Sequence, residues 1–140
     1  MPPEEDVELC DAAREAGLSF IRLVTPTTLG DRLPVVIEKA GGFVYYVAIA
    51  GITGTKSAAT DSIRSAFTRL REETDLPAVA GFGIRSAEQA NEVATIADGV
   101  VVGSALVQKI EDAVGSGDDK KLIADVGRFC ASLSAAMQRK

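Results

Sequence analysis

Glycines and hydroxyl side chains follow each apolar segment of this 140-residue sequence. Four apolar runs are typical of buried strands, and they are followed by Thr25, the segment 51–56, Gly83 and Gly103-Ser104. Ligands of parallel α/β folds bind at the carboxyl ends of strands. Glycine lets backbone N–H groups approach a ligand closely, and a helix N-terminus adds a positive dipole. The pattern predicts a phosphate site, although a tight turn also explains any single glycine.

Acid–base side chains are missing from these strand ends, which hold no Asp, Glu, His or Cys. A catalytic acid or base must reach the substrate within hydrogen-bond distance. Asp31 and Glu88 begin predicted helices, and Asp98 precedes the fourth strand, at the opposite end of the sheet. The chain has no histidine, and Cys10 and Cys130 are far apart in sequence, which excludes the usual metal-ligand patterns. We therefore expect no catalytic residue, no metal site and two buried or half-buried thiols in a reducing cytoplasm.

Lysine and tyrosine are the remaining side chains near the strand ends. We expect Lys56 to be solvated on a long loop over residues 51–60. Tyr45 and Tyr46 are consecutive in a strand, so one should face the barrel interior and the other the helices.

Helices and strands alternate strictly along the chain. The predicted helices span about 3–16, 30–40, 60–73, 87–96, 103–114 and 119–140, and the predicted strands span 18–24, 43–50, 77–82 and 100–102. Such alternation predicts a parallel sheet with right-handed crossovers. No linker or change in composition divides the sequence, so we expect one (βα)4 domain over residues 1–140 with flanking terminal helices.

Composition excludes several classes of protein. The chain is 46% hydrophobic and 25% charged, which argues against disorder. Its net charge is −5 and its basic residues are scattered, so nucleic acid is not an expected partner. It has no apolar stretch long enough to span a membrane and no signal peptide pattern, and we expect a cytoplasmic protein.

Three segments carry a resemblance to a known family. Residues 43–54 (FVYYVAIAGITG), 81–84 (GFGI) and 97–105 (ADGVVVGSA) resemble strands six, seven and eight of the tryptophan synthase α subunit with their loops. Leu76-Pro77 and residues 25–28 also match in order. The similarity covers essentially the whole chain, but only the second half of the family's sequence.

The resemblance implies an α/β fold that is one half of a (βα)8 TIM barrel. The family cleaves indole-3-glycerol phosphate to indole and glyceraldehyde 3-phosphate in tryptophan biosynthesis, a carbon–carbon lyase reaction. Tyr45 and Phe82 would line the substrate pocket, and Thr53 would lie on the lid. The substrate phosphate would be bound at Gly54, Gly83, Gly103 and Ser104.

The resemblance also implies that the catalytic groups and the cofactor of the family belong to polypeptide segments outside this chain. The family's catalytic Glu and Asp lie in the first half of its barrel, and this chain is expected to begin after the fourth strand. It would need no cofactor, because pyridoxal phosphate belongs to the partner β subunit. Ala48 and Ala50 replace hydroxyl residues common near the family's lid and partner surface. We expect the chain alone to be inactive.

An alternative function is a non-catalytic half-barrel scaffold that binds phosphate or associates with itself. Four strands cut from a barrel leave two unpaired edges, predicted at 18–24 and 99–102, and an exposed inner face. We expect a homodimer that pairs these edges. The competing structure is a monomer that flattens into an open sheet resembling flavodoxin.

Overall fold

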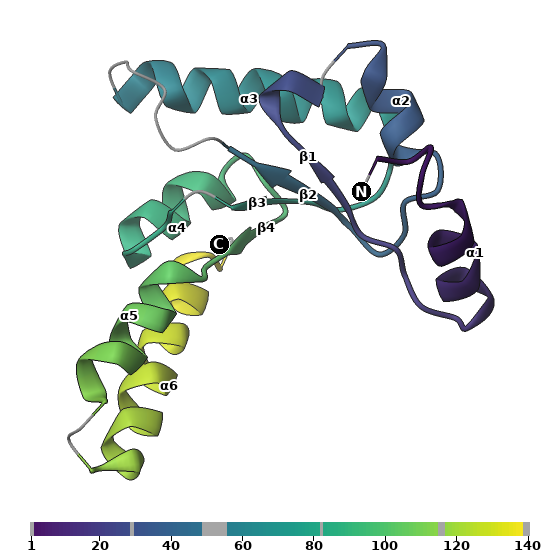
Figure 1. Ribbon diagram of the computed structural model, residues 1–140. Coiled ribbons are helices and arrows are strands. Elements are labelled where there is room, and N and C mark those ends of the chain that lie inside the picture. Colours follow the sequence, from purple (N-terminus) through teal and green to yellow (C-terminus); the bar gives the residue numbers. More distant parts are fainter. Residues whose placement is uncertain (1, 29, 49–55, 82, 115–116, 139–140) are drawn as a thin grey trace.

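The computed structural model describes residues 2–28, 30–48, 56–81, 83–114 and 117–138 (Figure 1). Helices and strands alternate along the described chain, as the sequence predicts. The helices are α1 (Val7–Glu15), the 3-10 turn η1 (Pro26–Thr28), α2 (Arg32–Ile37), α3 (Lys56–Glu73), α4 (Ala87–Ala94), α5 (Ser104–Ala113) and α6 (Asp119–Ala136). The strands are β1 (Arg22–Val24), β2 (Val44–Val47), β3 (Ala78–Gly81) and β4 (Gly99–Val101).

The four strands form one parallel sheet in the order β1-β2-β3-β4. Neighbouring strands in space are therefore neighbours in sequence, and α2, α3 and α4 lie in the connections between them. Parallel strands in sequence order with intervening helices are the repeating unit of a (βα)8 barrel. The fold is an α/β half-barrel, as predicted.

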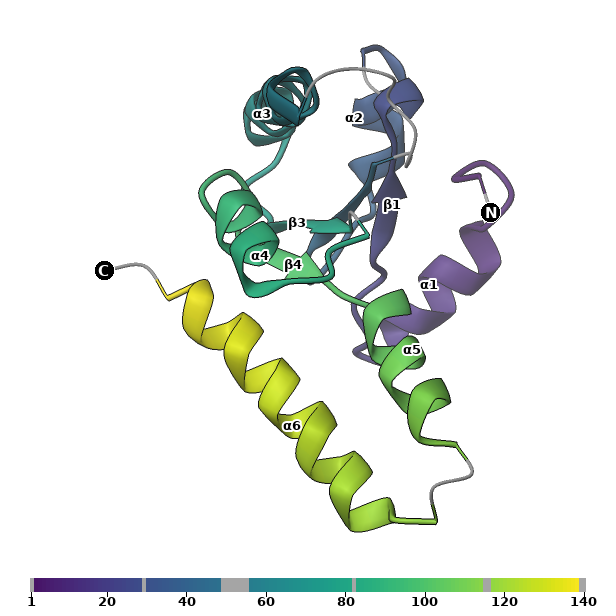
Figure 2. The same ribbon diagram turned by 90° about the vertical axis from the view of Figure 1, so that its left-hand side faces the viewer.

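The main core lies between α2, α3 and the outer face of the sheet. In Figures 1 and 2, α2 and α3 lie together along one side of the strands. The strand residues facing these helices alternate with residues on the inner face, because side chains alternate across a strand. Fully or nearly buried residues of this core include Val24, Val44, Tyr46, Ala78, Ala80, Leu33, Phe67 and Leu70. Ile63 and Ala66 of α3 are buried in the same core, so this helix has one apolar face with a helical spacing.

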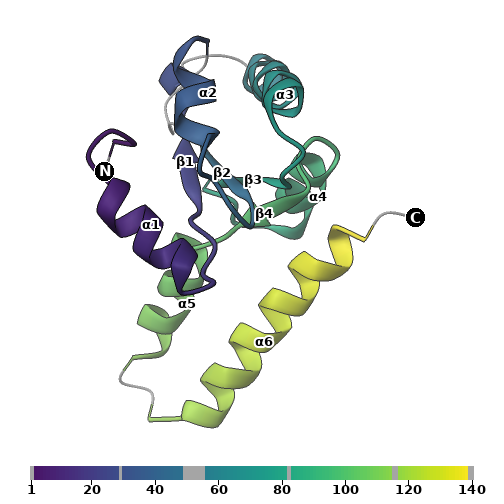
Figure 3. The same ribbon diagram turned by 90° about the vertical axis from the view of Figure 1, so that its right-hand side faces the viewer.

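A second apolar cluster joins α4 and α6 to the end of the sheet. Ala90 of α4 and Leu133 of α6 are buried in it together with Ile84. Phe129 of α6 and Met137, which directly follows it, pack against this cluster as partly buried residues. The helices α5 and α6 extend beyond the sheet as a pair (Figure 3).

Three expectations about the elements need correction. The helix α3 begins at Lys56, so this lysine does not lie on a loop that continues to residue 60. The strand β1 pairs with β2 only over Arg22–Val24, whereas the predicted strand began at residue 18, and Leu18, outside the paired stretch, is 64% exposed. Cys10 is buried as expected, whereas Cys130 is exposed on α6. Among the described residues, no helix is long and apolar enough to cross a membrane.

Candidate functional site

The register of β3 and β4 brings the predicted glycines to the same edge of the sheet. Gly81 of β3 is the pairing partner of Val101 of β4. Gly83 and Gly103 each follow these paired residues by two positions. The loops that carry them therefore leave neighbouring parallel strands in the same direction, as the sequence analysis expected.

Gly103 forms the N-cap of α5 and leaves the start of that helix open. It makes no side-chain cap hydrogen bond, and a Cβ atom built at this position would have no heavy atom within 4 Å. The first N–H groups of a helix have no intrahelical acceptor. Gly83 has a φ of +63°, the left-handed region that favours glycine, and it also faces open space. Both glycines thus border open space, and Gly103 does so at the N-terminus of α5.

The helix α4 fixes the loop that contains Gly83. The Ser86 hydroxyl accepts a hydrogen bond from the Gln89 N–H at 3.3 Å, and the Gln89 side-chain oxygen accepts one from the Arg85 N–H at 2.7 Å. This arrangement is a variant of the capping box, in which the return bond from the Gln89 side chain is made to Arg85 instead of the N-cap residue Ser86. The hydrogen bond from Ser86 also lowers the pKa of Glu88 below its usual value.

Ser104 lines a small pocket that also contains two basic side chains. The pocket has a volume of about 220 Å³, and both Arg85 and Lys109 line it. The Lys109 ammonium lies 4.7 Å from the centre of the Phe129 ring. Asp112, the carboxylate in this pocket, accepts a hydrogen bond from the Gln108 amide at 3.0 Å. The balance of charge beside the start of α5 favours an anion.

The two tyrosines of β2 point to opposite faces of the sheet, as predicted. Tyr46 is 1% exposed and packs edge-on against Phe67 of α3, with ring centres 5.5 Å apart. Burial raises the pKa of the Tyr46 hydroxyl. Tyr45 lies on the inner face, where its ring covers Gly81 so closely that a Cβ atom on Gly81 would overlap it. Tyr45 therefore lies at the same strand ends as Gly83.

Gly81→Ala is expected to displace the Tyr45 ring and lower stability by about 1–3 kcal/mol through overpacking. NMR chemical shifts of the Tyr45 ring and a denaturant titration would measure both effects. Adding Tyr45→Ala to this variant should relieve the overlap, while Gly103→Ala, which meets no atom, serves as the control. Unchanged Tyr45 shifts in Gly81→Ala would contradict this packing.

The hydroxyl groups after β1 bond mainly to one another. The Thr25 hydroxyl lies 2.8 Å from that of Thr27 and 3.0 Å from that of Thr28. The Thr28 hydroxyl also accepts a hydrogen bond from the Thr25 N–H at 3.1 Å. These bonds stabilise the turn η1, so the threonines have a structural role that their sequence position did not reveal.

Three predicted site residues, Thr53, Gly54 and Phe82, lie outside the described residues. Their assignments to the lid, the phosphate and the substrate pocket stay predictions.

Carboxylates occur at the amino ends of the strands instead of their carboxyl ends. The Asp98 carboxylate accepts a hydrogen bond from the Ala78 N–H at 3.0 Å, which ties the start of β4 to that of β3. This confirms that Asp98 lies at the structural end of the sheet. Within the described part of the chain, no three His, Cys, Asp or Glu side chains are grouped to hold a metal ion.

Sequence reasoning missed a buried ion pair between Asp6 and Arg22. Their side chains are 1% and 6% exposed, and the Arg22 guanidinium donates two hydrogen bonds to the Asp6 carboxylate. The guanidinium also lies 4.6 Å above the Phe20 ring, and it lies 3.8 Å from the Cys10 sulfur. The available signal was an arginine inside an apolar strand, because a buried charge requires a partner.

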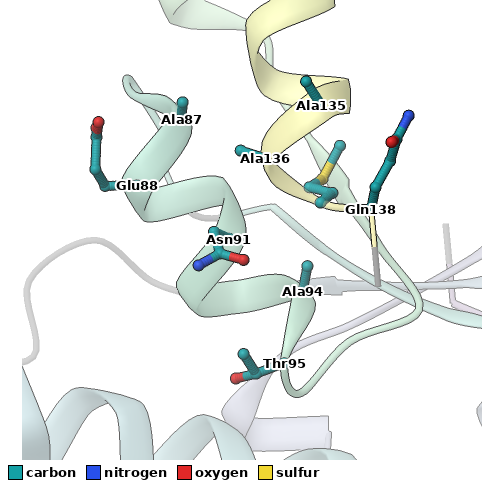
Figure 4. A pocket seen from close by; sticks show the side chains of 9 residues that line it. Ala87, Glu88, Asn91, Ala94, Thr95, Ala135, Ala136 and Gln138 are labelled. Carbon is teal, nitrogen blue, oxygen red and sulfur yellow. The ribbon is translucent and has the colours of Figure 1, made fainter. Parts of the chain in front are cut away.

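A separate hollow of about 780 Å³ lies between α4 and the end of α6 (Figure 4). It is lined by helix residues and by the residues that directly follow these helices, including Ala87, Ala94, Ala136 and Gln138. No strand-end loop contributes to it, and Glu88 is its one carboxylate. The strand ends therefore remain the candidate site.

Comparison with solved structures identifies the same class of protein that the half-barrel fold indicates, and the matched structures are tryptophan synthase alpha chains. A tryptophan synthase subunit alpha from Legionella pneumophila is 31% identical with a TM-score of 0.81, and the match covers 97% of this chain and 48% of that one. A Mycobacterium tuberculosis tryptophan synthase chain is 32% identical with a TM-score of 0.80, over 100% and 50%. A Campylobacter jejuni subunit alpha is 30% identical with a TM-score of 0.79, over 90% and 49%.

The family model described as tryptophan synthase alpha chain matches residues 1–138. The chain therefore belongs to the tryptophan synthase alpha chain family. It spans about half the length of the solved structures that it matches.

Proposed function

We propose that this chain is the phosphate-binding half of a tryptophan synthase α barrel and corresponds to strands five to eight. The observation that carries the proposal is the pairing of Gly81 with Val101, because the loops with Gly83 and Gly103 then follow neighbouring strands at the same edge of the sheet, and Gly103 is the N-cap of α5. Backbone N–H groups at a helix N-terminus bind phosphate, and barrels commonly bind it after their last two strands.

The proposed ligand is the phosphate of indole-3-glycerol phosphate. Gly83, Gly103 and Ser104 would donate N–H groups or a hydroxyl to it, and Gly54 would add a further backbone contact. Arg85 and Lys109 beside Ser104 favour the negative charge. Tyr45 and Phe82 would contact the indole and glycerol part, and Thr53 would lie on the lid. The parent reaction is cleavage to indole and glyceraldehyde 3-phosphate, with a pyridoxal phosphate-dependent β subunit as partner.

A half-barrel that binds phosphate without catalysis is the second candidate function. It is favoured by the chemistry of the loops after β2, β3 and β4, since residues 48–55, 82–86 and 102–104 contain no Asp, Glu, His or Cys. The two functions share the phosphate site and differ in whether indole is released.

Gly103→Asp is expected to weaken the binding of glycerol 3-phosphate at least about tenfold, because a fixed carboxylate would occupy the anion's place. The φ of −113° at Gly103 accepts a side chain, whereas the φ of +63° at Gly83 does not. Binding would be measured by amide NMR titration at low ionic strength, following the N–H signals of Gly83, Gly103 and Ser104.

Gly103→Asn is the matched control, since it has the same size without the charge. We expect Gly103→Asn to retain substantially more affinity than Gly103→Asp. Equal affinity in the two variants, or no shift of these three amide signals in the unmodified chain, would rule out the phosphate site.

A further inference from the structure

Three ion pairs join the α1 segment, residues 2–18, to the part of the chain that carries β1 and α2. All three carboxylates belong to the α1 segment, and all three cations belong to residues 22–39. The pairs are Glu4 with Arg32, Asp6 with Arg22, and Asp11 with Lys39. Residues 2–18 contain six carboxylates and one arginine, for a formal charge of −5. The charges of the α1 segment therefore repel one another and are held by cations of the neighbouring segment.

Apolar packing contributes little to the attachment of α1. Cys10 is the one buried residue of this helix, and both apolar clusters consist of residues from other parts of the described chain. The turn after α1 is closed inside the segment, by a hydrogen bond of 2.9 Å from the Leu18 N–H to the Ala13 carbonyl. In Figures 1 and 3, α1 lies beside β1, at the opposite end of the sheet from α4. Among the described residues, the ion pairs are therefore the main attachment of α1.

The Cys10 side chain is enclosed by the residues that form these ion pairs. Asp6 directly precedes α1, and its carboxylate accepts two hydrogen bonds from the Arg22 guanidinium instead of capping the helix. The Cys10 sulfur lies 3.8 Å from Arg22 Nη2 and 3.9 Å from the carbonyl oxygen of Lys39. The Lys39 ammonium in turn donates a hydrogen bond of 2.9 Å to Asp11. The accessibility of the Cys10 thiol therefore reports whether these pairs are closed.

The closed state gains little net free energy from its ion pairs. Burying two charges costs hydration free energy, which offsets much of their attraction. The Arg22 Nε is buried without a hydrogen-bond partner, so opening would hydrate it. The Glu4–Arg32 and Asp11–Lys39 pairs are partly exposed, and exposed pairs contribute little and are screened by salt. Segments with few buried apolar contacts open locally at a low cost in free energy.

We propose that the α1 segment is a strap that opens and closes as a unit on the intact sheet, with an opening equilibrium that depends on ionic strength. In the closed state its carboxylates neutralise the cations of β1 and α2. Opening breaks the three pairs together, because one short helix and the residues before it carry all three carboxylates, and it returns Cys10 and Arg22 to water. The strap lies beside β1, so it is independent of the phosphate site proposed after β3 and β4.

Thiol labelling of the full chain tests this proposal, since the two cysteines differ in exposure. Cys130 is exposed on α6 and should react at once with an aromatic disulfide reagent, whereas Cys10 should react only when the strap is open. At low denaturant concentrations the Cys10 rate should stay nearly constant, because a local opening exposes little surface. Raising NaCl from about 0.1 M to about 1 M should increase this rate about threefold, while hydrogen exchange of the β2 amides stays slow.

Substitutions of the strap carboxylates should increase the Cys10 labelling rate according to the burial of each pair. We expect Asp6→Asn to increase the rate at least about tenfold, because Arg22 loses its charged partner in a buried site. Asp11→Asn should increase it about two- to threefold, since its ion pair is partly exposed. Asp125→Asn is the matched control, because it removes the same charge from an ion pair within α6, and the rate should not change.

Three results would overturn the proposal. The first is a Cys10 rate that equals the global unfolding rate and rises steeply from the lowest denaturant concentrations, because no separate opening then exists. The second is a Cys10 rate equal to that of Cys130 in the unmodified chain, because the strap then does not close. The third is an equal rate in Asp11→Asn, Asp125→Asn and the unmodified chain at both salt concentrations, and this comparison decides the proposal if Asp6→Asn does not fold.

Discussion

The purified chain is expected to release no indole from indole-3-glycerol phosphate above the uncatalysed rate. Each correctly positioned general acid or base typically contributes about 10²–10⁴-fold to a rate. The described strand ends supply glycine, threonine, tyrosine and basic side chains. The Asp112 carboxylate in the pocket beside Ser104 accepts a hydrogen bond from Gln108, and the Asp98 carboxylate accepts one from the Ala78 N–H at the opposite end of the sheet. By resemblance, the Glu and Asp that act in the family belong to the other half of its barrel.

The measurement is indole production by the chain alone and by the chain mixed with the first half of a solved relative. A rise in rate in the mixture that Gly103→Asp reduces and Gly103→Asn preserves would support the lyase function. Steady indole production by the chain alone, abolished by Tyr45→Ala, would show that this half carries catalytic groups of its own. Phosphate binding without indole release in any mixture would favour the non-catalytic scaffold.

Asp6→Ala is expected to lower the melting temperature of the protein by roughly 10 °C or more. The substitution leaves the Arg22 guanidinium buried without its carboxylate, and breaking one partner of a buried ion pair is strongly destabilising. Part of this guanidinium already lacks a partner, because the Arg22 Nε makes no hydrogen bond. Thermal unfolding at a fixed protein concentration measures the effect.

Glu4→Ala provides the matched control for this prediction. Glu4 also pairs with an arginine, Arg32, but both side chains are about half exposed. Exposed ion pairs contribute little, so the melting temperature should change by about 3 °C or less. Equal losses in Asp6→Ala and Glu4→Ala would contradict the distinction between the buried and exposed pairs.

Acid should remove the contribution of the Asp6–Arg22 ion pair to the stability of the folded chain. Hydrogen bonds from Arg22 lower the pKa of Asp6 below its usual 3.8, although burial opposes this effect. The unfolded chain therefore binds the proton more readily than the folded chain. The stabilisation is fully present above the unfolded pKa and is lost as the pH falls through the folded pKa. Asp6→Asn should lose this dependence, so the difference in stability between it and the unmodified chain should shrink as the pH falls below the usual Asp value of 3.8.

Glu4 titrates in the same acid range and must be separated from Asp6. Its pairing with Arg32 lowers its pKa from 4.5 to about 2. The Glu4–Arg32 pair is exposed and contributes little to stability. The stability that an Asp6→Asn/Glu4→Gln variant loses in acid should therefore differ little from the stability that Asp6→Asn loses. A difference between the unmodified chain and Asp6→Asn that grows below about pH 4 would contradict the lowered pKa of Asp6.

Periodicity and turn chemistry predicted the order of elements because these signals are local. The apolar run around β2 and the spacing of Ile63, Ala66, Phe67 and Leu70 require no knowledge of distant residues. The first and last residues of each helix and strand were less predictable, since they depend on contacts with neighbouring elements. Strand β1 begins its pairing with β2 at Arg22 instead of residue 18, and α3 begins at Lys56, four residues before the predicted start at residue 60.

The sequence by itself determined the alternating order of helices and strands, the glycines after the strands and the lack of acid–base groups there, because composition and spacing along the chain are sufficient for each. That the strands form half of a barrel followed from the family resemblance. Only the tertiary structure paired Asp6 with Arg22 and placed Tyr45 over Gly81. These features depend on strand register and on helix packing, which bring together residues that are far apart in sequence, such as Asp6 with Arg22, 16 positions apart, and Tyr45 with Gly81, 36 positions apart. Local periodicity carries no information about such contacts, since it records which face of an element is apolar and not what lies against it.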